Sequence, residues 1–142
     1  MTLITWTDEL GIGVPEVDAQ HQRLVELVNA FDDAATQGRG TREIGGLLTS
    51  LTDYAVEHFA DEETTMRNLG YPDLDRHTRL HRQLVAKLED LRVQYEVNGR
   101  RITRPMLELL RYWLLEHIRG ADTAIGRYAA TAAPASVSRT SP

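Results

Sequence analysis

Apolar residues recur along most of the chain at steps of three and four positions, which is the period of an α-helix. The first such stripe begins near Asp18, a suitable N-cap, and ends before the glycines Gly38 and Gly40. Its inward positions are Val17, His21, Leu24, Val25, Val28 and Phe31. This spacing predicts a first helix that begins near residue 18 and ends before residue 38.

Three further apolar stripes follow, each bounded by residues that start or stop helices. The second lies between Thr41 and Gly70, because glycine suits the position just past a helix end. The third begins near Asp73, and the fourth begins near Thr103. No segment alternates as a strand does, and short connections make neighbouring helices antiparallel. The sequence therefore predicts an all-α fold, an up-down-up-down antiparallel four-helix bundle.

The two ends of the chain lack this pattern. Residues 1–17 contain Trp6 and are rich in glycine and proline, which oppose regular structure. We expect an extended N-terminal arm whose Trp6 packs on the bundle. Residues 129–142 consist of Ala, Ser, Thr and Pro with a few other residues, and we expect a disordered tail there. The bundle with its arm then occupies residues 1–128.

Composition narrows the class of protein. The chain has 142 residues, of which 42% are hydrophobic, and a net charge of −5, as expected for one globular domain. It has no run of basic residues for nucleic acid, and no apolar run approaches the ~20 residues that span a bilayer. Its lack of cysteine excludes thiolate metal sites and disulfides. We expect a cytoplasmic monomer without membrane insertion.

The five histidines carry the chemistry, because all of them fall on inward stripes. His58 and Glu62 are four residues apart, as are His77 and His81, so each pair shares one helix face. On neighbouring antiparallel helices, the candidate ligands lie at similar numbers of residues from the loop that joins the two helices. At each loop the best-matched pair of ligands is therefore level along the bundle to within about one helical turn. One layer of the bundle should then hold His21, His58, Glu62, His77, His81, His117 and Asp122.

A lone histidine on an apolar stripe is more often a core residue with a hydrogen-bond partner. Five histidines and two acids in one layer are different, because buried polar groups are costly unless they are paired. Seven ligands are too many for one first-row ion, and imidazole with carboxylate suits iron, copper, zinc or nickel. If both carboxylates and a solvent oxygen bridge two ions, the ion with two histidines keeps an open position. We therefore predict a two-metal site for a small molecule, with iron as the best candidate.

One spacing conflicts with a regular helix. His117 and Asp122 are five residues apart, which separates them by about 140° around an α-helix. Both can reach one site only if the helix ends, loosens or carries a π-bulge. Gly120 lies between them and makes such a change possible.

The order of the motifs, His, then HxxxE, HxxxH and HxxxxD, resembles the hemerythrin family, and in particular single-domain bacteriohemerythrins. The resemblance covers roughly residues 4 to 127. It implies two non-haem irons with an oxo or hydroxo bridge. The six-coordinate iron would be held by His77, His81 and His117, and the five-coordinate iron by His21 and His58, with Glu62 and Asp122 as bridges. Dioxygen would bind at the five-coordinate iron.

Four apolar residues adjoin these ligands in the sequence and should form the oxygen pocket: Phe59, Trp113, Leu114 and Ile118. By resemblance, Leu114 lies near the bound oxygen. An apolar pocket has no acid to help split the O–O bond, which favours reversible binding. We therefore predict an oxygen carrier, storage protein or supplier of an oxygen-using enzyme. The alternatives are a di-iron oxidoreductase (peroxidase or nitric-oxide handling), an oxygen or iron sensor, and a metal-holding module.

Overall fold

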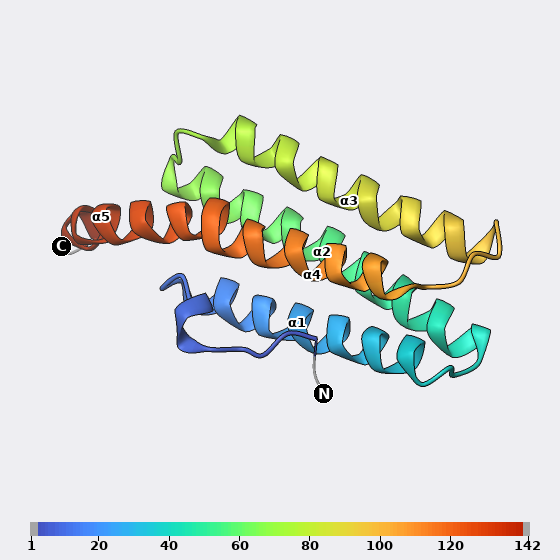
Figure 1. Cartoon of the computed structure of the whole chain (residues 1–142). Coiled ribbons are helices and arrows are strands. Elements are labelled where there is room, and N and C mark those ends of the chain that lie inside the picture. The colour runs from blue at the N-terminus through green and yellow to red at the C-terminus, as the bar shows by residue number, and fades with distance from the viewer. Residues whose placement is uncertain (1–2, 141–142) are drawn as a thin grey trace.

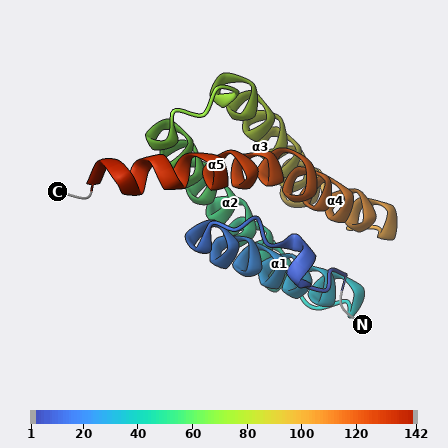
Figure 2. The same cartoon turned by 90° about the vertical axis from the view of Figure 1, so that its left-hand side faces the viewer.

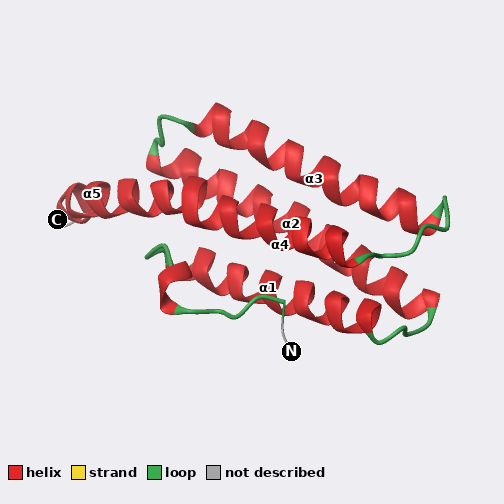
Figure 3. Cartoon of the chain, in the orientation of Figure 1, coloured by secondary structure: helices red, strands yellow, loops and turns green. Residues whose placement is uncertain are grey.

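The computed structural model describes the backbone of residues 3–140 and the side chains of residues 3–131. Its described residues form helices joined by loops, without a strand (Figure 3). The helices are α1 (Pro15–Thr36), α2 (Thr41–Leu69), α3 (Leu74–Glu96), α4 (Arg104–Glu116) and α5 (Thr123–Thr140). A π-helical turn, η2 (His117–Asp122), joins α4 to α5, so that these three form one continuous rod. The predicted antiparallel four-helix bundle is confirmed (Figure 1).

Most helix ends lie close to the residues that the sequence marks as helix boundaries. Gly70 ends α2 in the left-handed conformation, with a φ of 66°, which favours glycine. The prediction that Asp18 caps α1 is wrong, because Pro15 starts this helix one turn earlier. The Asp18 carboxylate instead accepts hydrogen bonds from the backbone N–H groups of Ile12 and Gly13, at 2.7 and 3.2 Å. Asp18 therefore ties the arm to α1.

Helix α2 is the centre of the bundle. It packs against α1 on one side and α3 on the other, and α5 also contacts it. The apolar stripes meet in one core, in which Phe31, Leu48 and Leu51 are at most 2% exposed. The backbones of α3 and α4 are farther apart than those of these packed pairs. A cleft lined by residues of both helices lies between α3 and α4.

The N-terminal arm lies along α1 (Figure 1) and contains one short 3-10 turn, η1 (Asp8–Leu10). Ile4 and Leu10 are 2% exposed, and Trp6 is half-buried against the core, as predicted. The backbone of Ile4 exchanges two hydrogen bonds with the Asn29 side chain, at 2.8 and 2.9 Å. Farther along the arm, the Ile12 carbonyl oxygen lies so close to Gly126 of α5 that a Cβ there would overlap it.

Helix α5 projects beyond the loops at its end of the bundle (Figures 1 and 2). It reaches Thr140 and so enters the segment 129–142 for which the sequence predicts disorder. From residue 132 onward the side chains lie outside the described residues, and the boundary at residue 128 stays a prediction. In the described part of the chain, no helix combines the length and apolar character needed to cross a membrane.

Candidate metal centre

The seven side chains singled out in the sequence meet inside the bundle. His21 comes from α1, His58 and Glu62 from α2, and the remaining four from α3 and η2. All seven are buried, from Glu62 and Asp122 at 0% exposed to His117 at 7%. The predicted layer is therefore present in the structure.

The two carboxylates divide the histidines into two groups. On the α3 side, Glu62 Oε1 lies 2.9 Å from Nε2 of both His77 and His81, and Asp122 Oδ1 lies 3.1 Å from Nε2 of His117. The other oxygen of each carboxylate turns toward α1. Asp122 Oδ2 lies 2.9 Å from Nε2 of His21, and Glu62 Oε2 lies 3.3 Å from Nε2 of His58. Glu62 thus presents one oxygen to His77, His81 and His117 and the other to His21 and His58. Asp122 presents one oxygen to His77 and His117 and the other to His21.

This division gives two donor sets suited to metal ions. One set is Glu62, His77, His81, His117 and Asp122, and the other is His21, His58, Glu62 and Asp122. Within each set, one donor atom from every residue lies within 4.8 Å of the others. The two sets share both carboxylates, which is the arrangement that bridging ligands require.

The π-helical turn η2 explains how one helix supplies two donors five residues apart. A π-helix has more residues per turn than an α-helix, so a spacing of five returns to the same face. His117 opens the turn and Asp122 closes it, and their side chains approach to 3.1 Å. The sequence-based expectation of a loosened helix is confirmed.

Two residues outside the predicted set orient the ligands. With Nε2 of a histidine directed at a metal, its Nδ1 carries the proton and can donate a hydrogen bond. Nδ1 of His58 lies 2.6 Å from the Gln20 amide oxygen, and Nδ1 of His81 lies 2.8 Å from a Glu63 carboxylate oxygen. Such partners fix the ring orientation and the tautomer. Gln20 and Glu63 each adjoin a ligand in sequence. That each contacts a different ligand, on the neighbouring helix, is evident only from the three-dimensional structure.

The charges of the cluster are strongly coupled. Burial lowers the pKa of His21 and of His117, but the close carboxylates of Asp122 and Glu62 outweigh it and raise both values to about 9. Burial and the Glu62 charge raise the pKa of Asp122, yet its histidine partners lower it to about 2. The same balance holds the pKa of Glu62 well below its usual range. Both carboxylates are therefore anionic at neutral pH.

The polar atoms of the cluster fit metal ions better than they fit one another. Among the described residues, eight buried side-chain nitrogen and oxygen atoms lack a hydrogen-bond partner, and seven of these belong to the cluster. They include Nε2 of His21, His58 and His117 and both oxygens of Asp122. Buried polar atoms are normally hydrogen-bonded. Nitrogen and oxygen atoms that converge on one place without forming hydrogen bonds are expected at a metal site, where the metal is their partner.

An apolar cavity of about 40 Å³ lies in the next layer of the bundle. Phe59, Trp113 and Leu114 of the predicted oxygen pocket line it. The Phe59 ring also stacks on His81, with centroids 4.1 Å apart. Ile118 is 1% exposed and packs in the core, but it does not line this cavity. Three of the four predicted pocket residues thus share a small apolar space beside the cluster.

The family model "Hemerythrin HHE cation binding domain" matches residues 12–129. The chain belongs to the hemerythrin family. The bacteriohemerythrin of Stenotrophomonas maltophilia is 34% identical over 124 residues, which cover 87% of this chain and 80% of that protein. The bacteriohemerythrin of Methylococcus capsulatus is 36% identical over 127 residues, which cover 89% and 96%.

Solved hemerythrin structures have the same fold. A structure described as wild-type hemerythrin superposes with a TM-score of 0.82 at 36% identity, covering 88% of this chain and 96% of that one. A hemerythrin L114A mutant superposes with a TM-score of 0.84 at 35% identity, covering 90% and 98%. The match extends from the arm through η2, so it includes all seven clustered residues of this hemerythrin domain.

Proposed function

We propose that this hemerythrin domain holds two non-haem iron ions and binds dioxygen reversibly. The division of the carboxylate oxygens carries the proposal. His77, His81 and His117, with Glu62 Oε1 and Asp122 Oδ1, would hold one iron. His21 and His58, with Glu62 Oε2 and Asp122 Oδ2, would hold the other. An oxo or hydroxo bridge would complete the pair.

This donor count makes the two ions unequal. With the bridge, the three-histidine side offers six ligands and the two-histidine side offers five, which leaves one position for a small molecule. Iron held by these residues would supply the electrons that dioxygen takes up on binding and returns on release. Imidazole and carboxylate suit iron by ligand type, and the cation-binding family supports a metal at this place.

The chain's own residues favour release of dioxygen over its reduction. Phe59, Trp113 and Leu114 surround an apolar space, and no lining residue of that cavity is ionisable. General acid catalysis needs a proton donor within hydrogen-bond reach of the reacting atom. Gln20 and Glu63 keep His58 and His81 in one orientation. The geometry therefore favours a carrier, a store or a supplier of an oxygen-using enzyme over an oxidoreductase. The predictions of a cytoplasmic location and a monomer remain untested.

The experiment that tests this function is anaerobic loading with ferrous iron, followed by an iron count and visible spectra as oxygen is admitted and removed. We expect two irons per chain and an absorption band that appears with oxygen and disappears on its removal. Immediate oxidation without a reversible band, with turnover when a reductant is added, would favour the oxidoreductase alternative. One iron or none per chain would contradict the two-metal site.

A further inference from the structure

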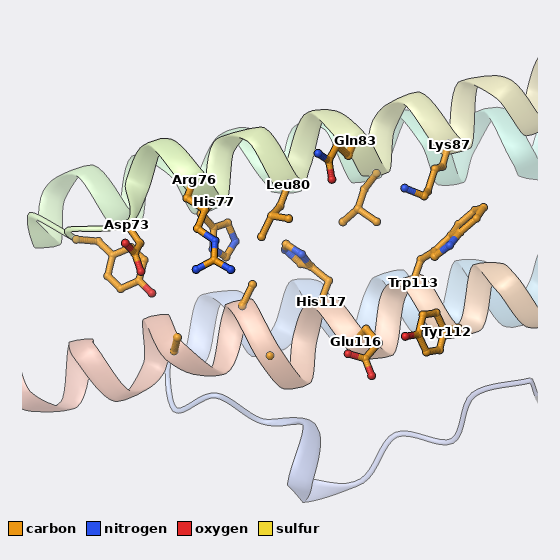
Figure 4. Close-up of a pocket in the computed structure, with 15 residues that line it drawn as sticks. Asp73, Arg76, His77, Leu80, Gln83, Lys87, Tyr112, Trp113, Glu116 and His117 are labelled. Atoms are coloured by element: carbon orange, nitrogen blue, oxygen red, sulfur yellow. The ribbon is translucent and has the colours of Figure 1, made fainter.

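A cleft of about 510 Å³ lies where α3 and α4 diverge, outside the apolar cavity described above. Arg76, Leu80, Gln83 and Lys87 form one stripe of α3 along it, and Trp113 and His117 lie on the opposite side (Figure 4). This volume lies within the ~300–1,000 Å³ that is usual for small-molecule sites. The cleft is therefore large enough for a compact organic molecule.

Two ligands of the same proposed iron, His77 and His117, line the cleft. They are 3% and 7% exposed, and their ring centroids lie 4.9 Å apart. Nε2 of each ring faces the carboxylates. Nδ1 of each ring bonds to no described residue, and neither atom is among the enclosed unpartnered atoms of the cluster. Both Nδ1 atoms are therefore open to the cleft.

These two rings differ from those of His58 and His81, which have Gln20 and Glu63 as partners for Nδ1. A metal-ligating histidine almost always donates its second ring N–H to a carboxylate, a carbonyl or water. For His77 and His117 the described protein supplies no such group. An acceptor from outside the chain can take this place.

The charges of the cleft favour an anionic acceptor. Neither Arg76 nor Lys87 forms an ion pair with a described residue, although both line the cleft. Lys87 Nζ lies 5.5 Å from the centre of the Trp113 ring. Figure 4 shows the Arg76 guanidinium directed toward the opposite helix, with Asp73 at one end and the Glu116 carboxylate turned away from α3. Arg76 thus supplies a positive charge beside His77, and Lys87 supplies another at the far end of the cleft beside Trp113 (Figure 4). Leu80, Leu84 and Trp113 contribute apolar surface.

We propose that the α3–α4 cleft binds a small organic monocarboxylate. Its carboxylate would accept hydrogen bonds from Arg76 and from Nδ1–H of His77 and His117, and its apolar body would lie on Leu80, Leu84 and Trp113. A planar guanidinium and two ring N–H groups suit a planar, bidentate acceptor. The part played by the ring N–H groups rests on the proposed function, because it requires metal on Nε2.

Benzoate is a suitable probe, with benzyl alcohol as a neutral molecule of the same shape. Calorimetric titration of the iron-loaded protein should show saturable binding of benzoate to one site and none of benzyl alcohol. Arg76→Gln should weaken benzoate binding about tenfold, the loss expected for one charge-assisted hydrogen bond. Arg79→Gln is the matched control, since Arg79 is an exposed arginine of α3 that does not line the cleft. It should leave the affinity unchanged.

A spectroscopic measurement tests the contact with the ligands. In zinc-loaded protein, which is diamagnetic, benzoate should shift the Nδ1–H resonances of His77 and His117 and leave those of His58 and His81 unchanged. Absence of benzoate binding, equal loss in Arg79→Gln, or shifts confined to other histidines would overturn the proposal. Equally tight binding of inorganic phosphate would overturn the assignment to carboxylates.

The two proposals can fail separately. If the protein holds two irons and binds oxygen reversibly but does not bind benzoate, only the cleft proposal is contradicted. Failure to bind iron would contradict the proposed function. Benzoate binding would then be measured on the metal-free protein. There, Arg76-dependent benzoate binding would support the cleft, and its absence would overturn it.

Discussion

Protons hold the seven clustered residues together when no metal is bound. The pKa of His21 and of His117 is about 9, so both rings are cationic at neutral pH and offset the charges of Glu62 and Asp122. Metal ions would take the place of these protons. Loading at neutral pH should therefore release protons into a weakly buffered solution.

The stability of the metal-free protein should fall as the pH rises above neutrality. A histidine whose pKa rises from 6.5 to about 9 on folding stabilises the fold fully below pH 6.5 and no longer above about 9. Asp122, whose pKa falls from 3.8 to about 2, stabilises the fold above pH 3.8 and loses that effect as the pH falls through about 2. We expect denaturant unfolding to show greatest stability near pH 4–6 and a loss of at least ~3 kcal/mol by pH 9, the amount that one such histidine shift carries.

A His21→Gln variant is the control for this pH profile. It removes one of the two strongly shifted histidines, so its metal-free stability should fall less steeply between pH 6.5 and 9. A wild-type stability that stays level or rises over this interval would contradict the charge state described for the cluster.

At the scale of the elements, the contact between the arm and α5 depends on one glycine. Gly126 is buried, and the Ile12 carbonyl oxygen occupies the space that a Cβ would need. Gly126→Ala should displace the arm from α5 and lower the free energy of unfolding by about 2 kcal/mol, in the range of overpacking substitutions. Thermal or denaturant unfolding measures the effect.

Gly46 provides the comparison for this substitution. It is an exposed glycine within α2 that has no atom within 4 Å of an added Cβ. Gly46→Ala should stabilise the protein by up to ~1 kcal/mol, because alanine is the better helix former. An equal response to the two substitutions would show that the arm does not depend on close approach to α5.

Local signals in the sequence predicted most of the elements. Gly70 and Thr103 marked helix boundaries correctly because their effect is local: one adopts a positive φ, and the other accepts a hydrogen bond from Met106 N at 3.4 Å. The cap assigned to Asp18 was wrong because its carboxylate bonds to the arm, a tertiary contact that competes with capping. The loosening around Gly120 followed from the incompatible spacing of two ligands on one helix.

The site could be predicted only in part. The converging donors follow from helical periodicity and loop position, which need no knowledge of side-chain contacts. The partners Gln20 and Glu63 depend on the rotation of neighbouring helices, which periodicity does not fix. The cleft depends on the separation of α3 and α4, and no residue pattern encodes that distance. Ile118 adjoins a ligand in sequence yet packs in the core, away from the cavity lined by Leu114.

At the scale of the whole molecule, metal binding and folding should be linked, because the donors come from every rod of the bundle. His77→Ala removes one donor that contacts both carboxylates, at 2.9 and 3.0 Å. We expect lower iron content and a loss of ~3 kcal/mol or more from the iron-loaded protein, comparable to ligand linkage at 100 times the dissociation constant. An iron count with thermal unfolding, before and after chelation, measures both effects.

Arg79→Ala, an exposed neighbour on α3, should retain the iron and the stability of the loaded protein. Unchanged unfolding of His77→Ala in both the loaded and the metal-free state would contradict the assignment of His77 as a ligand.

Asp122 and His21 come from the last and the first rods of the bundle, yet they approach to 2.9 Å. During folding, hairpins of neighbouring helices can form early, since their loops are short and cost little closure entropy. The contact between the first and last rods joins distant parts of the chain and should form after these hairpins. A chain still emerging from the ribosome cannot present both donor sets until η2 has been synthesised. Iron would therefore be retained only by chains that have completed folding, and incorporation of the metal would report the final step of assembly.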